Sequence, residues 1–155
     1  MTGRSGGCVC GQLRYVLEGE PLVVHACHCS YCQRETGSAF ATNLLIEADR
    51  VRFEGRGERV LTPSASGKGQ VIVRCPECQV AVSSHYPGAG EAFHFIRVGT
   101  IDEHRDIAPD IHIYISTKQP WVVIPDGVPA FEEFYDPAQA WSEEMRARYR
   151  KAKER

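Results

Sequence analysis

The stretch Cys27-His28-Cys29-Ser30-Tyr31-Cys32 brings three thiols close together and decides how the rest of the chain is interpreted. Two shorter motifs accompany it, Cys8-Val9-Cys10 near the start and Cys75-Pro76-Glu77-Cys78 in the middle of the chain. A tight C-x-C or C-x-x-C turn presents two thiolates to one metal ion, and a tetrahedral zinc needs four ligands. Buried free cysteines occur singly and would not form three such clusters, so the sequence predicts metal binding.

The seven cysteines are predicted to divide into a group of four and a group of three. The group of four is a closed structural zinc site made of two pairs, Cys8 with Cys10 and Cys75 with Cys78. The group of three is Cys27, Cys29 and Cys32. A zinc ion held by three thiolates keeps its fourth position free for water or substrate, which is the usual difference between catalytic and structural zinc.

Spacing alone leaves other arrangements open. Any two of the three cysteine clusters can in principle share one metal ion. The central cluster can also form a closed site if His25 or His28 supplies the fourth ligand, since histidine is the other common ligand of zinc.

An open zinc ion with three thiolate ligands favours one kind of chemistry. Three thiolates donate much negative charge, so the metal is a weaker activator of water than one held by neutral histidines. A soft site of this kind is suited to capturing a substrate thiol as the thiolate, because it lowers the thiol pKa from the ~8.5 of a free cysteine. Such a thiolate can attack a carbonyl carbon.

Several segments resemble one known family, in order and in spacing. They are Gly6–Gly11, Cys27–Ser38, Cys75–Cys78, His112–Trp121 and Asp126–Pro129. Together they resemble the glutathione-dependent formaldehyde-activating enzyme family, which also includes centromere protein V. The resemblance runs from about Gly6 to Phe131. At Gln79 this chain departs from the family, which usually has glycine after the last cysteine, where a left-handed turn is convenient.

The resemblance implies a β-tent fold, a carbon-sulfur lyase type of activity and two zinc ions. It assigns the cysteines to a structural and a catalytic metal in the same way as the count of ligands does. The family's prototype reaction adds glutathione to formaldehyde, reversibly, to give S-hydroxymethylglutathione. A glutathione-like thiol is therefore the expected small-molecule partner.

Three residues near the central thiols are predicted to support this chemistry. His28 lies between two predicted ligands, and an unperturbed pKa near ~6.5 suits proton transfer from a thiol or to the oxygen of a hemithioacetal. Its alternative role is a hydrogen bond behind the metal ligands. Gln33 and Arg34 follow the last ligand, where the Arg34 guanidinium suits a glutathione-like carboxylate, although a plain surface arginine fits the sequence equally well.

The rest of the chain predicts a mainly β domain with a C-terminal helix. Strand patterns cover residues 13–18, 22–24, 71–73, 93–98 and 111–115. Fourteen glycines and nine prolines separate these runs, as in a β-rich domain with many turns. We therefore expect a zinc-binding domain over residues 1–135 and a helical tail over residues 136–155.

The predicted C-terminal helix begins with good capping residues. Asp136 is a favourable N-cap, and Pro137 fits the first helical position. Trp141, Met145 and Tyr149 follow at helical spacing, which indicates a packing face rather than a ligand site.

Length and charge limit the alternatives. A chain of 155 residues with a formal net charge of -2 fits one domain and gives no sign of binding nucleic acid or an anionic membrane. No apolar stretch reaches the ~20 residues of a spanning helix, and the first residues lack the pattern of a signal peptide, so we expect the cytoplasm. In that reducing compartment clustered cysteines bind metals rather than form disulfides. The sequence leaves the oligomeric state open.

Three functional classes follow from these observations. The first is a zinc-dependent carbon-sulfur lyase-like enzyme that joins a glutathione-like thiol to formaldehyde or a related electrophile. The second is a non-catalytic module with two closed zinc sites, against which the near-neutral charge argues. The third is a zinc deaminase. Its H-x-E element is missing, because Cys27 and Ser30 stand two positions after His25 and His28.

Overall fold

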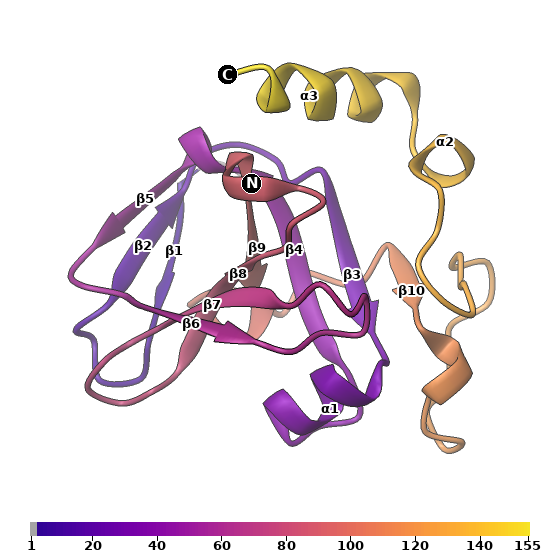
Figure 1. Cartoon of the computed structure of the whole chain (residues 1–155), viewed down its shortest axis with the longest axis horizontal. Helices are drawn as coiled ribbons and strands as arrows, with labels where there is room; N and C mark the ends of the chain where they lie inside the picture. The colour runs from indigo at the N-terminus through magenta and orange to yellow at the C-terminus, as the bar shows by residue number, and fades with distance from the viewer. Residues whose placement is uncertain (1–2) are drawn as a thin grey trace.

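The computed structural model describes residues 3–155 and contains two β-sheets (Figure 1). The smaller sheet has the order β1-β2-β5, with β1 at Arg4–Gly7, β2 at Arg14–Leu17 and β5 at Val51–Glu54. The larger sheet has the order β10-β3-β4-β9-β8-β7-β6. Its strands are β3 (Val23–Cys27), β4 (Ala41–Glu47), β6 (Glu58–Thr62), β7 (Gln70–Arg74), β8 (Ala81–His85), β9 (Phe93–Arg97) and β10 (Ile111–Ile113).

Most neighbouring strands are antiparallel, and β10 pairs with β3 in parallel. The α-helices are α1 (Ser30–Thr36), α2 (Pro137–Ala140) and α3 (Glu143–Lys153). Four short 3-10 helices are η1 (Ala48–Arg50), η2 (Gly90–Ala92), η3 (Val98–Thr100) and η4 (Ile115–Thr117). The predicted mainly β fold with a C-terminal helix is confirmed.

The core has two parts, because the middle strands of the larger sheet are buried on both faces. Leu44 and Ile46 of β4 pack with Tyr15 of the smaller sheet, whereas Leu45, on the opposite face, packs with Tyr135 of the C-terminal segment. Alternate residues of a strand point to opposite faces, so β4 contributes to both clusters. The smaller sheet and the C-terminal segment therefore cover opposite faces of the larger sheet, as their positions in Figure 1 indicate.

The C-terminal helix is broken, which corrects the prediction of one continuous helix. Asp136 caps α2 by accepting a hydrogen bond from the Ala138 N–H at 2.9 Å. Trp141 then adopts an extended backbone (φ -104, ψ 144), and the Ser142 hydroxyl accepts from the Met145 N–H at 3.2 Å to begin α3. A serine at this position competes with the helical backbone as a second N-cap, which is why the helix restarts there.

The predicted packing face of this segment is confirmed. Trp141, Met145 and Tyr149 all join the core cluster on the C-terminal side of the larger sheet. Among residues 3–155, no helix is both long enough and apolar enough to cross a membrane.

Candidate metal centres and adjoining cavity

The first cysteine cluster lies where the two sheets meet. The loop between β1 and β2 supplies Cys8 and Cys10, and the turn between β7 and β8 supplies Cys75 and Cys78. All four sulfur atoms lie within 4.8 Å of one another, with 3.5 Å between Cys8 and Cys10 and 3.6 Å between Cys10 and Cys75. The backbone N–H of Leu13 donates to the Cys8 sulfur at 3.3 Å. This cluster could hold a metal ion with four sulfur ligands, and such an ion would join the two sheets.

The turn after Cys75 forms without the glycine that is usual in the resembled family. Gln79 adopts a left-handed backbone with φ 61, and its N–H donates to the Cys75 carbonyl at 2.9 Å. Its side-chain amide donates to the Pro76 carbonyl at 3.0 Å. These hydrogen bonds stabilise a conformation that a non-glycine residue adopts at a cost.

The second cluster lies at the junction of β3 and α1. Cys27 ends the strand, Cys29 caps the helix, and Cys32 lies in its first turn. The Cys29 sulfur accepts a hydrogen bond from the Cys32 N–H at 3.3 Å, so one of the proposed ligands also fixes the start of the helix. The three sulfur atoms lie within 4.8 Å of one another, and all three residues are buried. Sequence analysis did not predict α1, although Gly37 at φ 63 ends it as a common left-handed cap.

The charge balance of this cluster favours a bound cation. Hydrogen bonds from the Cys27 and Cys32 thiols lower the pKa of Cys29 to about 3, although burial opposes this shift. The hydrogen bonds to Cys29 and Cys32, together with burial, raise the pKa of Cys27. The three thiols therefore compete for ionisation, and a cation is needed to hold them all as thiolates. A metal ion is bound by thiolates, so the donor set fits a soft divalent ion such as zinc.

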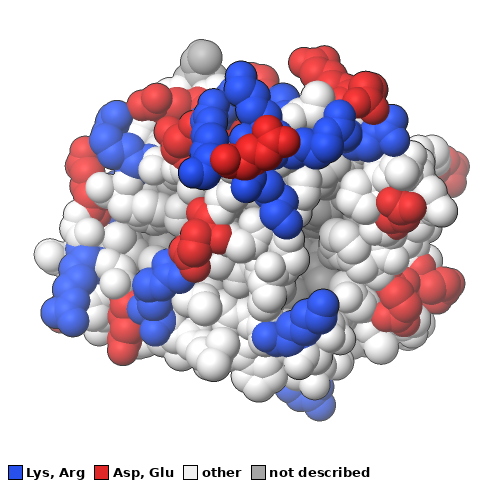
Figure 2. Space-filling view, turned by 45° about the horizontal axis from the view of Figure 1, so that its top comes forward, with Lys and Arg blue, Asp and Glu red and all other residues white. Residues whose placement is uncertain are grey.

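A cavity of about 340 Å³ opens beside this cluster. Cys27 and Cys32 line it directly, as does His25 from the same strand. The other walls include residues of β4 and β9, the segment 86–89 after β8, the loop between β6 and β7, and the C-terminal segment. In Figure 2 a band of basic and acidic side chains runs across the upper part of the molecule, and the hollowed surface below it consists mainly of residues that are neither.

No histidine completes the second cluster. In the part of the chain that the structure describes, no histidine nitrogen joins the three mutually close sulfur atoms. His25 Nε2 lies 2.6 Å from the Tyr135 hydroxyl, and burial lowers the pKa of His25 to about 4. The closed arrangement with His25 or His28 as a fourth ligand is therefore not the one that the structure adopts.

His28 lies apart from the cavity. Its Nε2 lies 2.8 Å from His112 Nδ1, and its ring packs against Phe40 with 5.0 Å between the ring centroids. Burial, followed by the charges of His112 and Lys118, lowers the pKa of His28 to about 4. His28 does not line the cavity. These contacts favour a supporting role for His28, in which it forms a hydrogen bond behind the metal ligands, over a role in proton transfer to a bound substrate.

Gln33 and Arg34, which the sequence predicts at the substrate site, lie in two different environments. The Gln33 amide donates to the His28 carbonyl at 2.7 Å and to the Thr117 carbonyl at 2.9 Å, while its oxygen accepts from Gln119 at 2.7 Å. Gln33 therefore ties α1 to the segment after β10. Arg34 is exposed in the last turn of α1 and does not line the cavity.

Sequence reasoning missed a buried cation near the thiols. Arg97 is 7% exposed, donates to the Asn43 side-chain oxygen, and has no hydrogen-bond partner for Nε and Nη2. The hydrogen bond with Cys27 and, more weakly, the charge of Arg97 act to lower the pKa of Cys32, but Cys29 and burial raise it overall. Nothing in the local sequence marks Arg97, because it lies in an ordinary strand pattern.

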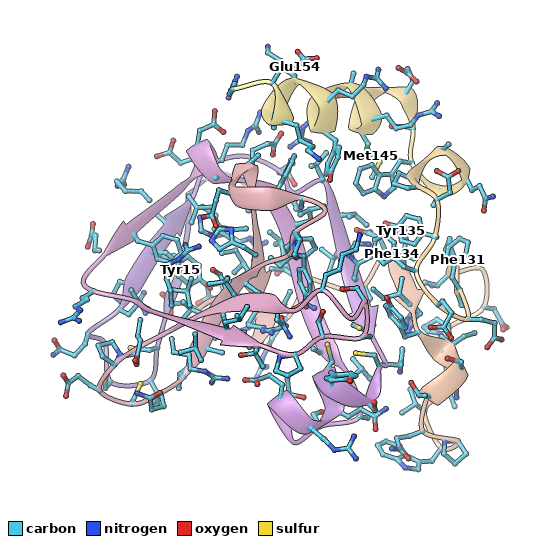
Figure 3. The ribbon with its side chains drawn as sticks, viewed as in Figure 1. Tyr15, Phe131, Phe134, Tyr135, Met145 and Glu154 are labelled. Atoms are coloured by element: carbon cyan, nitrogen blue, oxygen red, sulfur yellow. The ribbon has the colours of Figure 1, made fainter. Side chains whose placement is uncertain are left out.

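The aromatic wall of the cavity was also missed. Phe131, Phe134 and Tyr135 gather between β10 and α2, and Met145 points toward them from α3 (Figure 3). Phe134 stacks on Tyr135 with 4.8 Å between the ring centroids, and the Trp141 N–H donates to the Tyr135 hydroxyl at 2.7 Å. The sequence shows these aromatic residues but does not show that Phe134 and Trp141 line the cavity beside the thiols.

The fold and these sites define a small, mainly β protein with two cysteine clusters that could hold metal ions. A model of the family described as "Glutathione-dependent formaldehyde-activating enzyme" matches residues 3–117. The chain belongs to this family, as the sequence motifs predict. The family is associated with glutathione and with the activation of formaldehyde.

Comparisons with individual proteins add little to this assignment. No curated protein sequence matches the chain. Among solved structures, the crystal structure of a Rhodobacter sphaeroides protein, a structural genomics target, superposes with a TM-score of 0.49 and 17% sequence identity. That superposition covers 64% of this chain and 88% of the other.

Proposed function

We propose that this chain is a zinc-dependent carbon-sulfur lyase-like enzyme. It captures a glutathione-like thiol at a metal held by Cys27, Cys29 and Cys32, and it joins that thiol reversibly to formaldehyde or a related small electrophile. The observation that carries the proposal is a group of three buried thiols with no fourth protein ligand among residues 3–155. Two of these thiols line a cavity. The four-cysteine cluster is proposed to hold a second, structural zinc ion.

The proposed reaction is balanced by one proton transfer. The substrate thiol loses its proton, its sulfur forms a bond to the carbonyl carbon, and the carbonyl oxygen gains a proton. The reverse reaction breaks the same carbon-sulfur bond. A zinc ion at the second cluster would supply positive charge that lowers the pKa of the thiol.

The chain's own residues contribute shape and charge to this reaction. The cavity holds the thiol and the electrophile next to each other and excludes bulk water from the reacting atoms. Gln33 holds α1 in place through two backbone carbonyls, and His28 supports the ligand segment from the side away from the cavity. Arg34 is available at the surface for a substrate carboxylate that extends beyond the cavity. The reducing cytoplasm is the proposed compartment, since it keeps the thiols free.

The test combines metal analysis with X-ray absorption at the zinc edge. We expect about two zinc ions per chain in protein purified without oxygen, and sulfur coordination that rises when glutathione is added. A single zinc ion, or two ions whose coordination does not change when glutathione is added, would instead support the non-catalytic two-metal module. Protein with Cys29→Ser is the control, because its thiol-dependent change should disappear.

A further inference from the structure

The cavity beside the second cluster has walls that the family match does not include. Residues 118–155 lie outside the matched part, which covers residues 3–117. Phe134, Pro137, Trp141 and Tyr149 from this C-terminal segment nevertheless line the cavity. The part of the pocket that lies beyond the family match is therefore aromatic and apolar.

Apart from the thiols of the second cluster, the cavity lining carries one charged side chain among the described residues. Lys68, on the loop before β7, is the only lining residue among Lys, Arg, Asp and Glu in the described part of the chain. No hydrogen bond or ion pair within residues 3–155 engages its ammonium group. A ligand carboxylate would find a cation here. A ligand ammonium would find no carboxylate, and the thiolates beside it would already be bound to the metal ion, so enclosing this group costs free energy.

One polar side chain in the cavity wall lacks a partner. Gln70, the first residue of β7, is 2% exposed, and its side-chain oxygen has no hydrogen-bond partner in the described part of the chain. A buried polar atom without a partner is costly, so it is commonly satisfied by water or by a ligand. A carboxamide offers both a donor and an acceptor, so an amide group of a ligand can pair with it in either orientation.

From these three features we infer the class of thiol that the cavity selects, an inference that rests on the proposed function. The preferred substrate is a thiol whose amino group is blocked by an apolar acyl group, which leaves one amide and one carboxylate. The carboxylate meets Lys68, the amide pairs with Gln70, and the acyl group contacts the wall that includes Phe134. Glutathione carries a free ammonium group and a second carboxylate, and it is the poorer ligand.

The experiment measures dissociation constants by calorimetry on the full, zinc-loaded chain. N-benzoylcysteine should bind about tenfold more tightly than glutathione, because it adds aromatic contact and removes an unpaired ammonium. N-benzoylalanine lacks the sulfur atom and therefore reports the cavity without the metal. It should bind more weakly than N-benzoylcysteine but detectably, whereas alanine should not bind.

Two pairs of variants assign the contacts. Phe134→Ala should weaken the binding of both benzoyl compounds by about three- to tenfold, because it removes apolar contact. Phe134 is half exposed, so its loss spares the core. Trp121→Ala removes another exposed aromatic residue, which does not line the cavity, and should change neither constant. Lys68→Met should weaken the benzoyl compounds by several-fold, whereas Lys151→Met, at an exposed position in α3, should not.

The outcomes separate this inference from the proposed function. If thiols alter the zinc coordination but glutathione binds as tightly as N-benzoylcysteine, the inferred substrate class is wrong and the proposed function stands. If no thiol alters the zinc coordination, the proposed function is wrong, and binding of N-benzoylalanine that Phe134→Ala weakens still supports the selectivity of the cavity. If Phe134→Ala and Trp121→Ala behave alike, the aromatic wall does not select the ligand.

Discussion

At the scale of single residues, the structure shows where the chain accepts a local cost to complete a site. Gln79 adopts a left-handed backbone after the last cysteine of the first cluster. The geometry of the C-x-x-C turn requires this conformation, and glycine adopts it without steric cost. The turn forms with glutamine at this position, so the departure from the family's usual glycine does not disturb the first cluster.

Replacing Gln79 with glycine should therefore stabilise the protein. The free energy of unfolding of Gln79→Gly should rise by about 0.5 kcal/mol, because relief of the left-handed strain exceeds both the entropy that glycine adds to the unfolded chain and the loss of the exposed side-chain hydrogen bond to Pro76. Urea denaturation of the zinc-loaded protein measures it. Glu77→Gly, in the same turn but without a positive φ, should instead lower the stability, and equal effects of the two changes would refute the argument.

His94 should make the stability depend on pH. Burial, followed by the charge of His85, lowers the pKa of His94 to about 4 in the folded protein. The unfolded chain binds the proton near pH ~6.5, so it takes up more protons than the folded chain as the pH falls below this value. Stability is therefore fully present above pH ~6.5 and is lost as the pH falls toward 4.

A variant isolates this effect from metal release, which acid also promotes. Between pH 7 and pH 5.5, the free energy of unfolding of His94→Gln should fall by about 1 kcal/mol less than that of the unmodified protein. His104→Gln, at an exposed histidine, should follow the unmodified protein. If all three proteins show the same pH dependence, His94 is not a source of it.

At the scale of elements, α3 is held to the larger sheet by an ion pair as well as by its apolar face. Arg148 of α3 donates to both carboxylate oxygens of Glu47 at the end of β4, at 3.0 and 2.9 Å. Glu47 is 5% exposed, and Arg50 Nε lies 3.7 Å from its carboxylate as a second, longer ion pair. The same arginine donates to the Glu20 carbonyl at 2.9 Å.

Removal of Arg148 should loosen the C-terminal segment. Arg148→Ala should lower the free energy of unfolding by about 2 kcal/mol, since it removes two charged hydrogen bonds from a buried carboxylate and leaves it only Arg50, whose Nε lies 3.7 Å away. Arg150→Ala breaks an exposed pair with Glu143 and should change stability by less than about 0.5 kcal/mol. Denaturation curves test both, and hydrogen exchange in α3 should accelerate only in Arg148→Ala.

The sequence predicted the elements with strong local patterns and missed those that depend on contacts. The runs 13–18, 93–98 and 111–115 contain β2, β9 and β10, because alternation is a local signal. The helix α1 was missed, since it is short and is capped by a cysteine whose main signal is metal binding. The break at Trp141 depends on how the tail turns across the sheet, which no local pattern records.

At the scale of the whole molecule, the two cysteine clusters have different structural positions. Counting ligands correctly grouped the four and the three, because short motifs constrain which thiols can meet. It could not show that the first group joins the two sheets while the second lies at a cavity. That distinction comes from the topology, which brings the β1–β2 loop to the β7–β8 turn.

These positions predict opposite effects of two similar substitutions. Cys75→Ser should unfold the protein or lower its melting temperature strongly, because a structural metal contributes directly to folding. Cys29→Ser should keep the fold, retain about one zinc ion per chain and lose activity with thiol and formaldehyde. Circular dichroism and metal analysis check the two variants, and equal unfolding of both would contradict the division of roles.

The broken C-terminal segment gives the protein an internal optical reporter. Of the two tryptophans, Trp141 is 7% exposed and lines the cavity, whereas Trp121 is 71% exposed. An indole in an apolar wall emits at shorter wavelength than one in water, so the two emissions should be separable. With Trp121→Phe, all tryptophan fluorescence would come from Trp141 in the cavity wall. A compound that enters the cavity should then change the wavelength or intensity of this emission, without a label.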